Sequence, residues 1–148
     1  MSTFKLVSSI LVGTFVLFSL IPYGEKTNPP VDKNLTLQAP KEVMSILKRS
    51  CYDCHSNQTK WPFYSSIFPM SWSIADHVKN GRRALNFDLW KQYDEEKRWE
   101  YLEEIVDKTK AKQMPLPSYL WLHADAKLSK KDIKTLDNWA QNAEDEEE

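Results

Sequence analysis

The sequence predicts an all-α protein, a bundle of about four helices preceded by an N-terminal hydrophobic helix. In four segments, apolar residues recur at the three- and four-residue spacing of an amphipathic helix. No segment shows the strict alternation of apolar and polar residues that is typical of a half-buried strand. The chain has 148 residues, which is enough for one domain with a single modest core.

The N-terminal segment carries no charge from Leu6 to Ile21 and directly follows Lys5. It is slightly short for a bilayer-spanning helix, which needs roughly 17–25 residues, but Tyr23 can extend it. No small-x-small cleavage pattern comes after it, so an uncleaved anchor is favoured over a removed signal. We therefore expect residues 1–21 to be a membrane anchor or signal and the rest to be exported.

The remaining chain divides by composition and periodicity. Residues 22–40 are rich in proline and polar residues, which predicts an extended tether. A domain over residues 41–143 is expected to hold four helices, at residues 41–50, 71–84, 94–110 and from 129 onwards. Ser129 and Asp132 have the spacing of a capping box at the start of the last helix. Residues 144–148, EDEEE, are expected to form a solvated acidic tail.

Composition limits the possible functions. Twenty Lys and Arg against 21 Asp and Glu give a net charge of −1, so there is no electrostatic reason to expect a nucleic-acid partner. Three glycines are too few for a glycine-rich phosphate loop. Six tryptophans are many for so small a domain, and they suit either an ordinary core or a pocket for a large flat ligand.

The stretch CYDCH at residues 51–55 contains both cysteines of the chain. A thiol–disulfide active site normally opens a helix in a βαβ unit, and no such strands are predicted. A structural zinc site needs four ligands, usually in two pairs, and beyond the cysteines only His55, His77 and His123 remain. A structural disulfide is possible, but closing so short a loop gains little entropy.

Covalent haem attachment explains the motif better than these alternatives. On one helical turn Cys51, Cys54 and His55 project to one side. Two thiols can then add to the two vinyl groups of a porphyrin edge, and the histidine can reach the iron from one face. The sequence therefore predicts one haem c per chain, with His55 as the proximal iron ligand.

A sixth ligand should come from the other side of the haem. Met114 stands in a loop with two prolines, QMPLPSY, and a thioether there suits low-spin iron. The usual role of a lone methionine is to fill a core, but a proline-rich loop packs poorly as core. Met114 is thus the expected distal ligand, Met70 is second, and His77 and His123 are expected to be surface, packing or capping residues.

The haem face also needs an apolar cover, and its propionates need cations or donors. Aromatic residues follow the motif closely, and Trp61, Tyr64 and Trp72 are candidates for the pocket. Arg82 is a candidate partner for the propionates, although most arginines only solvate a surface.

Four stretches resemble the membrane-tethered haem-binding domain family of bacteria: CYDCHSNQTKWPFY, NGRRALNFDLW, QMPLPSYLWLH and LSKKDIKTLDNWA. The similarity runs from about Asn28 to Ala140. It implies a cytochrome c-like helical fold around one covalent haem. By this resemblance, Cys51 and Cys54 carry the haem, His55 is the proximal ligand and Met114 is the distal one.

Two classes of function remain at this stage. The favoured one is an electron carrier rather than an enzyme, because two protein ligands leave no open position on the iron. It would be held at the periplasmic side of the inner membrane by residues 5–23 and would pass electrons to a redox protein that the sequence does not name. The alternative is a haem-based sensor or a peroxidase-like domain with a labile sixth ligand.

Overall fold

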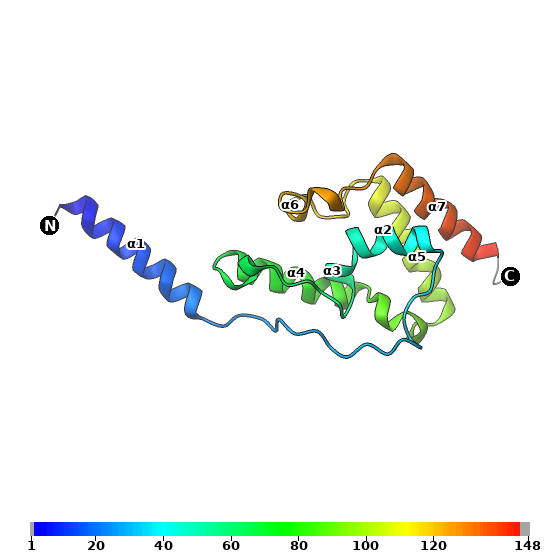
Figure 1. The fold of residues 1–148 in the computed structure, drawn as a ribbon, viewed down its shortest axis with the longest axis horizontal. Helices are drawn as coiled ribbons and strands as arrows, with labels where there is room; N and C mark the ends of the chain where they lie inside the picture. The colour runs from blue at the N-terminus through cyan, green and yellow to red at the C-terminus, as the bar shows by residue number, and fades with distance from the viewer. Residues whose placement is uncertain (1, 146–148) are drawn as a thin grey trace.

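A computed structural model of the chain describes residues 2–145. Over those residues the chain has seven α-helices, three short 3-10 helices and no strand, which confirms the predicted all-α class. Figure 1 shows a long N-terminal helix that stands apart from a helical domain, and an extended segment that joins the two. The first and the last described residues lie at opposite ends of the molecule.

Helix α1, Thr3–Leu20, is the separate N-terminal helix. It is long and apolar enough to cross a membrane, with a mean hydropathy of 1.8 over an 18-residue window, and none of its residues is buried. A core helix of similar composition would be mostly covered by protein. An export signal and a membrane anchor share this length, composition and position near the N-terminus.

Residues 22–40 form neither helix nor strand, with a turn at residues 33–35, and they bind along the domain. Leu37 is buried, and its amide donates to the carbonyl of Phe87 at 2.8 Å. The side-chain amide of Asn28 donates to the carbonyl of Thr59 at 2.9 Å. The segment is therefore a strap along one edge of the domain (Figure 1), and its last part contributes to the core.

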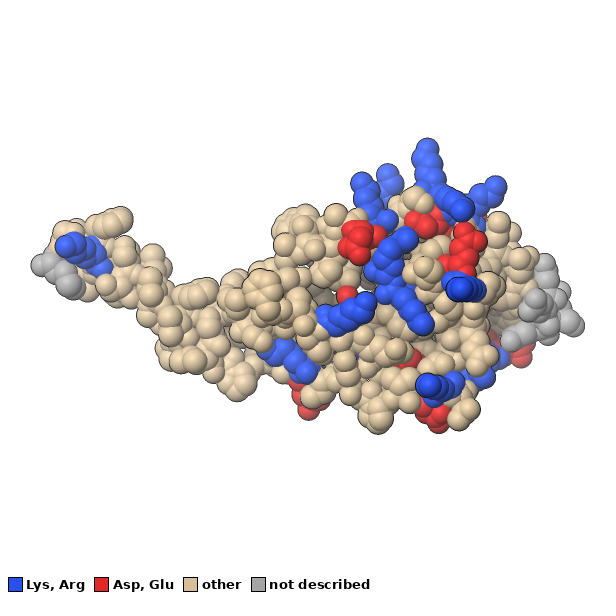
Figure 2. All heavy atoms as spheres, in the orientation of Figure 1, with Lys and Arg blue, Asp and Glu red and all other residues tan. Residues whose placement is uncertain are grey.

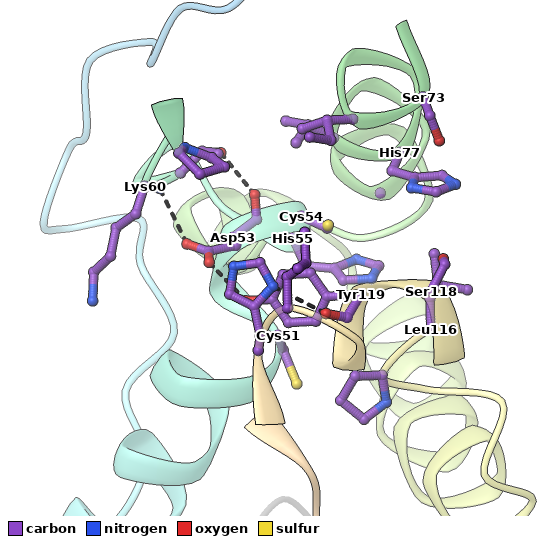
Figure 3. A pocket seen from close by; sticks show the side chains of 18 of the residues that line it. Cys51, Asp53, Cys54, His55, Lys60, Ser73, His77, Leu116, Ser118 and Tyr119 are labelled. Carbon is purple, nitrogen blue, oxygen red and sulfur yellow. Dashed lines mark hydrogen bonds between the residues drawn. The ribbon is translucent and has the colours of Figure 1, made fainter. Parts of the chain in front are cut away.

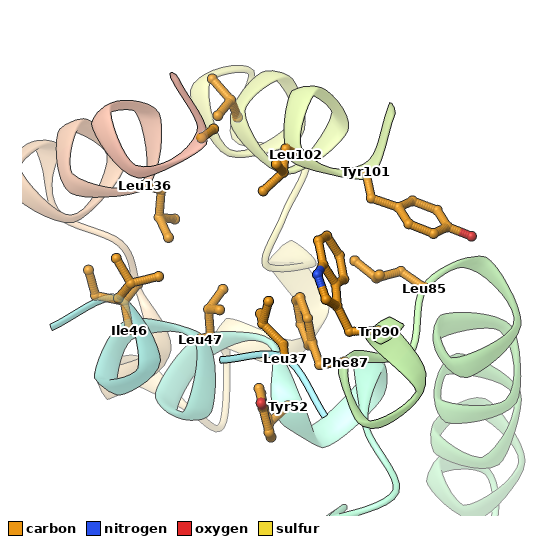
Figure 4. Close-up of a cluster of buried hydrophobic side chains, with 13 residues drawn as sticks. Leu37, Ile46, Leu47, Tyr52, Leu85, Phe87, Trp90, Tyr101, Leu102 and Leu136 are labelled. Atoms are coloured by element: carbon orange, nitrogen blue, oxygen red, sulfur yellow. The ribbon is translucent and has the colours of Figure 1, made fainter. Parts of the chain in front are cut away.

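The core lies where three of the long helices meet (Figure 4). These are α2, Lys41–Ser50, α5, Glu95–Lys110, and α7, Lys130–Asp145, with the 3-10 helix η2, Phe87–Gln92, packed against them. The helices α2, α5 and α7 each begin within one residue of the predicted start. The buried apolar side chains are Leu37, Val43, Ile46, Leu47, Tyr52, Leu85, Phe87, Trp90, Tyr101, Leu102, Val106, Leu136 and Ala140.

Local capping explains where α5 and α7 begin. The side chain of Asp94 accepts a hydrogen bond from the amide of Lys97 at 2.8 Å. Ser129 and Asp132 form the predicted capping box, in which each side chain accepts from the other residue's amide, at 3.1 and 2.8 Å. Helix α7 runs through Asp145, so the first two residues of the predicted acidic tail are helical, and residues 146–148 lie outside the described residues.

The other half of the domain is built from shorter pieces around one long helix. The long helix is α4, Met70–Ala84, which begins one residue before the predicted range. The short pieces are α3, Tyr52–His55, η1, Phe63–Ser66, α6, Pro117–Leu120, and η3, Ala124–Ala126. The sequence predicted α3 as the helical turn of the cysteine motif, but it did not predict the other three, because a single turn is too short to show an apolar period.

Candidate functional site

A cavity of about 490 Å³ lies between α3, α4 and residues 114–123. Small-molecule and cofactor sites have volumes of roughly 300–1,000 Å³ and mainly apolar linings, and this cavity has both properties. Figure 3 shows α3, α4 and α6 around it, with Cys51, Cys54, His55, His77 and Tyr119 among the labelled side chains.

The cysteine motif forms one wall of the cavity. Cys51 ends α2, and the amides of Cys54 and His55 donate to its carbonyl at 3.1 and 3.0 Å, which makes a single tight turn. All three residues line the cavity, as the one-sided projection of the motif predicts.

Both thiols are free, and no disulfide joins them. Burial raises the pKa of Cys51 to about 12 and that of Cys54 to about 11. A catalytic redox thiol needs a pKa below its ordinary value. The environment of this pair thus differs from that of a thiol–disulfide active site.

His55 is held in a defined orientation by its second ring nitrogen. Its Nδ1 lies 3.1 Å from the carbonyl oxygen of Leu85, directly after α4. Burial lowers the pKa of His55, against the hydrogen bonds to Leu85 and the backbone of Gly81, which raise it. In the neutral tautomer that donates from Nδ1, the lone pair of Nε2 is available, which is the state that a metal-ligating histidine requires.

Helix α4 turns one continuous face to the cavity. The lining residues of this helix recur at the three- and four-residue spacing of one helical stripe, and they are Met70, Ser73, Ile74, His77, Val78, Gly81 and Ala84, with Asn80 beside them. His77 thus faces the cavity, whereas the sequence led us to expect a surface or packing residue.

Gly81 lets α4 approach the cysteine motif closely. A Cβ atom at this position would lie 2.5 Å from the carbonyl oxygen and 3.0 Å from the Cβ of Cys54. Such distances do not occur between non-bonded atoms, so only glycine fits here without a shift of the helix or the turn. This close approach places the α4 stripe beside the motif.

Residues 114–123 form a further wall of the cavity. Met114 lines it together with Pro115, Leu116, Tyr119 and Trp121. The start of this segment is fixed to the end of α5, because the Met114 amide donates to the carbonyl of Lys108 at 3.1 Å. The prolines do not prevent helix formation here, because Pro117 occupies the first position of α6, where no amide donor is needed.

A chain of side-chain contacts ties this wall to the motif. The hydroxyl of Tyr119 donates to Oδ2 of Asp53 at 2.7 Å, and Oδ1 of Asp53 accepts from the Lys60 amide at 3.1 Å. The rings of Tyr119 and His123 stack with their centroids 4.0 Å apart, and Nε2 of His123 lies 3.3 Å from the hydroxyl oxygen of Tyr64. His123 lines the cavity, and its Nδ1 lies 3.0 Å from the carbonyl oxygen of Tyr119 in α6, which is a capping contact of the kind expected from the sequence.

Of the candidate pocket residues, only Tyr64 is among the side chains that line the cavity. Trp72 lies on another face of α4, where it stacks on Tyr23 at 4.8 Å. The indole nitrogen of Trp61 donates to the side chain of Asn28 at 3.3 Å. Both aromatic residues pack against the N-terminal part of the chain.

Arg82 also has a role other than the one expected. Its guanidinium donates to the carbonyls of Ser56 and Thr27 at 2.8 and 2.9 Å, and to the side chains of Asn28 and Thr59 at 2.9 and 2.8 Å. These contacts occupy most of its donors. Arg82 joins the strap to the loop after the motif, and it does not line the cavity.

Asp88 is a supporting residue that the sequence gave no reason to single out. It is only 1% exposed, and its carboxylate accepts from the Asn57 amide and the Gln58 side chain, both at 2.8 Å. Asn86 donates to the side chain of Asn57 at 2.8 Å. These bonds fix the loop directly after His55 to the segment that follows α4.

Among the described residues, no group of three or more His, Cys, Asp and Glu side chains is placed to hold a metal ion by itself. The site instead combines two thiols, a part-buried imidazole and a thioether around one mainly apolar cavity. That donor set and that lining fit a porphyrin with a central iron.

The model of a family described as the haem-binding domain matches residues 13–142, which is most of the chain. The chain belongs to this haem-binding domain family. The match covers the strap, the cavity and the core helices together, and it supports haem as the ligand of the cavity. Neither the curated proteins nor the solved structures gave a significant match.

Proposed function

We propose that this haem-binding domain is a c-type haem protein that carries electrons, with His55 and Met114 as the two axial ligands of the iron. The observation that carries the proposal is that Cys51, Cys54, His55 and Met114 line the same cavity. Met114 is far from the motif in the sequence, so its position at this cavity is a property of the fold.

The free thiols of Cys51 and Cys54 suit covalent attachment. Each thiol would add across one vinyl group: its S–H bond and the π bond of the vinyl group break, an S–C and a C–H bond form, and no oxidant is consumed. The cysteine turn keeps both side chains on the cavity wall for this purpose.

The two axial positions would be taken by residues from different walls. His55 would bind through Nε2, because its Nδ1 is engaged with Leu85. Met114 would bind through its thioether, and the Tyr119–Asp53 hydrogen bond would hold its segment close to the motif. Haem iron with His and Met ligands supplies one-electron redox chemistry at a raised potential.

The covalent attachment is tested by acid–acetone extraction and intact mass. The colour should stay with the protein, and its mass should exceed that of the polypeptide by one haem. The Cys51→Ala, Cys54→Ala double variant should release all haem into the extract. Free haem from the unsubstituted protein would contradict covalent attachment and leave haem binding itself intact.

The distal ligand is tested by Met114→Ala, with Met70→Ala as the matched control, since both methionines line the cavity. Met114→Ala should abolish the weak near-infrared sulfur-to-iron band, lower the potential and open the iron to carbon monoxide, and Met70→Ala should do none of these. If His77→Ala has these effects on carbon monoxide binding instead, His77 is the ligand. If the unsubstituted ferrous protein already binds carbon monoxide readily, a sensing or peroxidase-like function replaces electron transfer.

The proposed location is the periplasmic side of a bacterial inner membrane, with α1 as the anchor. Lys5 in the first turn of α1 is the one charged residue of this helix, and its place at the N-terminal end supports this orientation. Protein that stays with the membrane after alkaline carbonate extraction and keeps its N-terminus agrees with an anchor. A soluble protein that begins near residue 24 would mean a cleaved signal, and export would still hold.

A further inference from the structure

An exposed apolar rim lies beside the cavity, and Met70, Trp121 and Leu122 belong both to this rim and to the cavity lining. Two segments contribute to the rim: Phe63, Ile67 and Met70 around η1 and the start of α4, and Trp121 and Leu122 after α6. Phe63 and Trp121 are 84% and 82% exposed, although both are large aromatic residues. Exposed apolar side chains that gather in this way usually mark a surface that another phase or molecule covers.

Both segments of the apolar rim are free of charge. The sequence from Pro62 to Ile74 holds no charged residue, and neither does the sequence from Gln113 to Leu122. Figure 2 shows that, on the face in view, the end of the domain next to α1 is mainly uncharged, while charged side chains gather over the remainder. An uncharged aromatic rim suits the interfacial layer of a bilayer better than an ionic protein contact.

The last turns of α1 pack directly on one of these segments. Phe18 stacks on Phe68 with ring centroids 5.2 Å apart, and Phe15 contacts the same ring at 6.5 Å. Phe18 also meets Trp72 edge to face at 6.0 Å. The rim therefore begins beside the helix that is apolar enough to span a membrane.

The level of this contact along α1 gives the depth of the rim. Phe18 and Phe15 precede the end of α1 at Leu20 by two and five residues, which is about 3 and 7.5 Å at a rise of about 1.5 Å per residue. Interfacial segments are buried to about 5–10 Å in the bilayer. If α1 crosses the membrane and ends at its surface, Phe68 lies within the interfacial layer, and the neighbouring rim residues lie at or near the surface.

The backbone of the inserted segment is compatible with this environment. The amide of Ile67 donates to Tyr64 at 3.1 Å, that of Ser71 to Ile67 at 2.8 Å, and that of Trp72 to Pro69 at 3.3 Å. Irregular backbone is costly near hydrocarbon when its polar groups lack partners. Here the turns supply such partners within the segment.

We propose that the apolar rim docks into the interfacial layer of the same bilayer that holds α1, and so keeps the neighbouring cavity at the membrane surface. Figure 1 supports this orientation, because α6 and the N-terminal end of α4 both lie on the side of the domain that faces α1. The proposal rests on α1 being a retained anchor, and it does not depend on how the haem is ligated.

Photo-crosslinking on the full chain tests the docking. Benzoylphenylalanine replaces Phe63 or Trp121 in full-length protein reconstituted in phosphatidylcholine vesicles, and Glu103, exposed on α5 at the far part of the domain, is the control position. Mass spectrometry should find lipid adducts at positions 63 and 121 and none above background at 103. Equal background yields at all three positions would overturn the proposal.

Two further measurements separate the possible failures. The same crosslinkers are also tested in native membranes. If positions 63 and 121 form adducts with a protein there and form none with lipid in vesicles, the rim binds a protein partner and lipid docking is refuted. If alkaline carbonate releases the chain from the membrane, α1 is not a retained anchor, and the docking proposal is refuted as well. The haem absorbance of the same samples reports the cofactor independently, and it should stay unchanged when Phe63, which does not line the cavity, is replaced.

Discussion

The core half and the cavity half of the domain are stabilised in different ways. In the core half, α2, α5 and α7 bury their apolar stripes against one another and against η2. In the cavity half, α4 packs on α3 at Gly81 and turns the other residues of the same stripe towards the cavity. The core half carries its own hydrophobic core. The cavity half has, in the position of such a core, a cavity with room for a ligand.

The difference shows what the haem contributes to the fold. A helix gains most of its stability in a protein from packing of its apolar face. For α4 that packing would come from the haem, and a covalently attached ligand cannot dissociate to expose it again. We therefore expect the core half to fold in the absence of haem and the cavity half to become ordered only with it.

The largest expected effect is in the core half. Leu47 is fully buried, and Leu47→Ala should lower the free energy of unfolding by about 2–5 kcal/mol, because it removes packing that no neighbour replaces. Denaturant titration followed by far-UV circular dichroism should give this loss in both haem-loaded and haem-free protein. The control is Leu122→Ala at the rim, which should cost little in haem-free protein. Equal costs for the two variants there would remove the distinction between the halves.

The next effect concerns the wall formed by residues 114–123. Tyr119→Phe removes the hydrogen bond to Asp53 but keeps the ring stack on His123, and it should cost about 1.5–3 kcal/mol because the acceptor is a carboxylate. Hydrogen exchange should increase in residues 114–123 and not in α5 or α7.

The matched control for that variant is Tyr23→Phe, whose hydroxyl meets Asp76 in an exposed pair at 3.1 Å. Its cost should stay within about 0.5 kcal/mol, as for most surface changes. If hydrogen exchange in α7 also increased in Tyr119→Phe, the two halves of the domain would unfold together.

A third variant tests the close approach of α4 to the motif. Gly81→Ala places a methyl group against the Cys54 carbonyl, and the resulting overpacking should cost about 1–3 kcal/mol and reduce haem incorporation. Gly13→Ala in α1 is the control, since no atom lies within 4 Å of the added Cβ. Haem content per chain, from absorbance, should fall for the first variant alone. Normal haem content in Gly81→Ala would show that the turn can shift freely.

The smallest effect is at the start of α7. Burial raises the pKa of Asp132, but hydrogen bonds with Ser129 and the nearby Arg49 outweigh it, so the pKa lies below its ordinary value. A lowered carboxyl pKa stabilises the fold above the unfolded pKa of roughly 3.9, and this stabilisation is lost as the pH falls below it. Asp132→Asn should cost about 0.5–2 kcal/mol at neutral pH.

The same variant should flatten the loss of stability below about pH 4. Asp107→Asn on the exposed face of α5 is the control and should leave the acid profile unchanged. An unchanged profile in Asp132→Asn would place the acid sensitivity of the domain elsewhere.

The sequence by itself determined the long elements and indicated haem as the ligand. The ranges of α2, α4, α5 and α7 followed from apolar spacing, and the start of α7 followed from Ser129 and Asp132. These features depend on residues three or four apart, so local steric and hydrogen-bonding rules are sufficient to predict them. The CxxCH spacing indicated haem in the same way, and the family match agrees with haem as the ligand.

The tertiary structure decided which side chains surround the cavity and which ones hold it. The partner of His55, the Leu85 carbonyl, is 30 residues away in the sequence, and Asp53 and Tyr119 are 66 residues apart. Arg82 was expected near the propionates, yet it binds the strap, and His77 faces the cavity because of how α4 is rotated on the motif. The rotation of α4 depends on Gly81, whose missing Cβ allows the contact with Cys54. Such contacts arise only when distant segments meet, and no periodicity within a single segment contains that information.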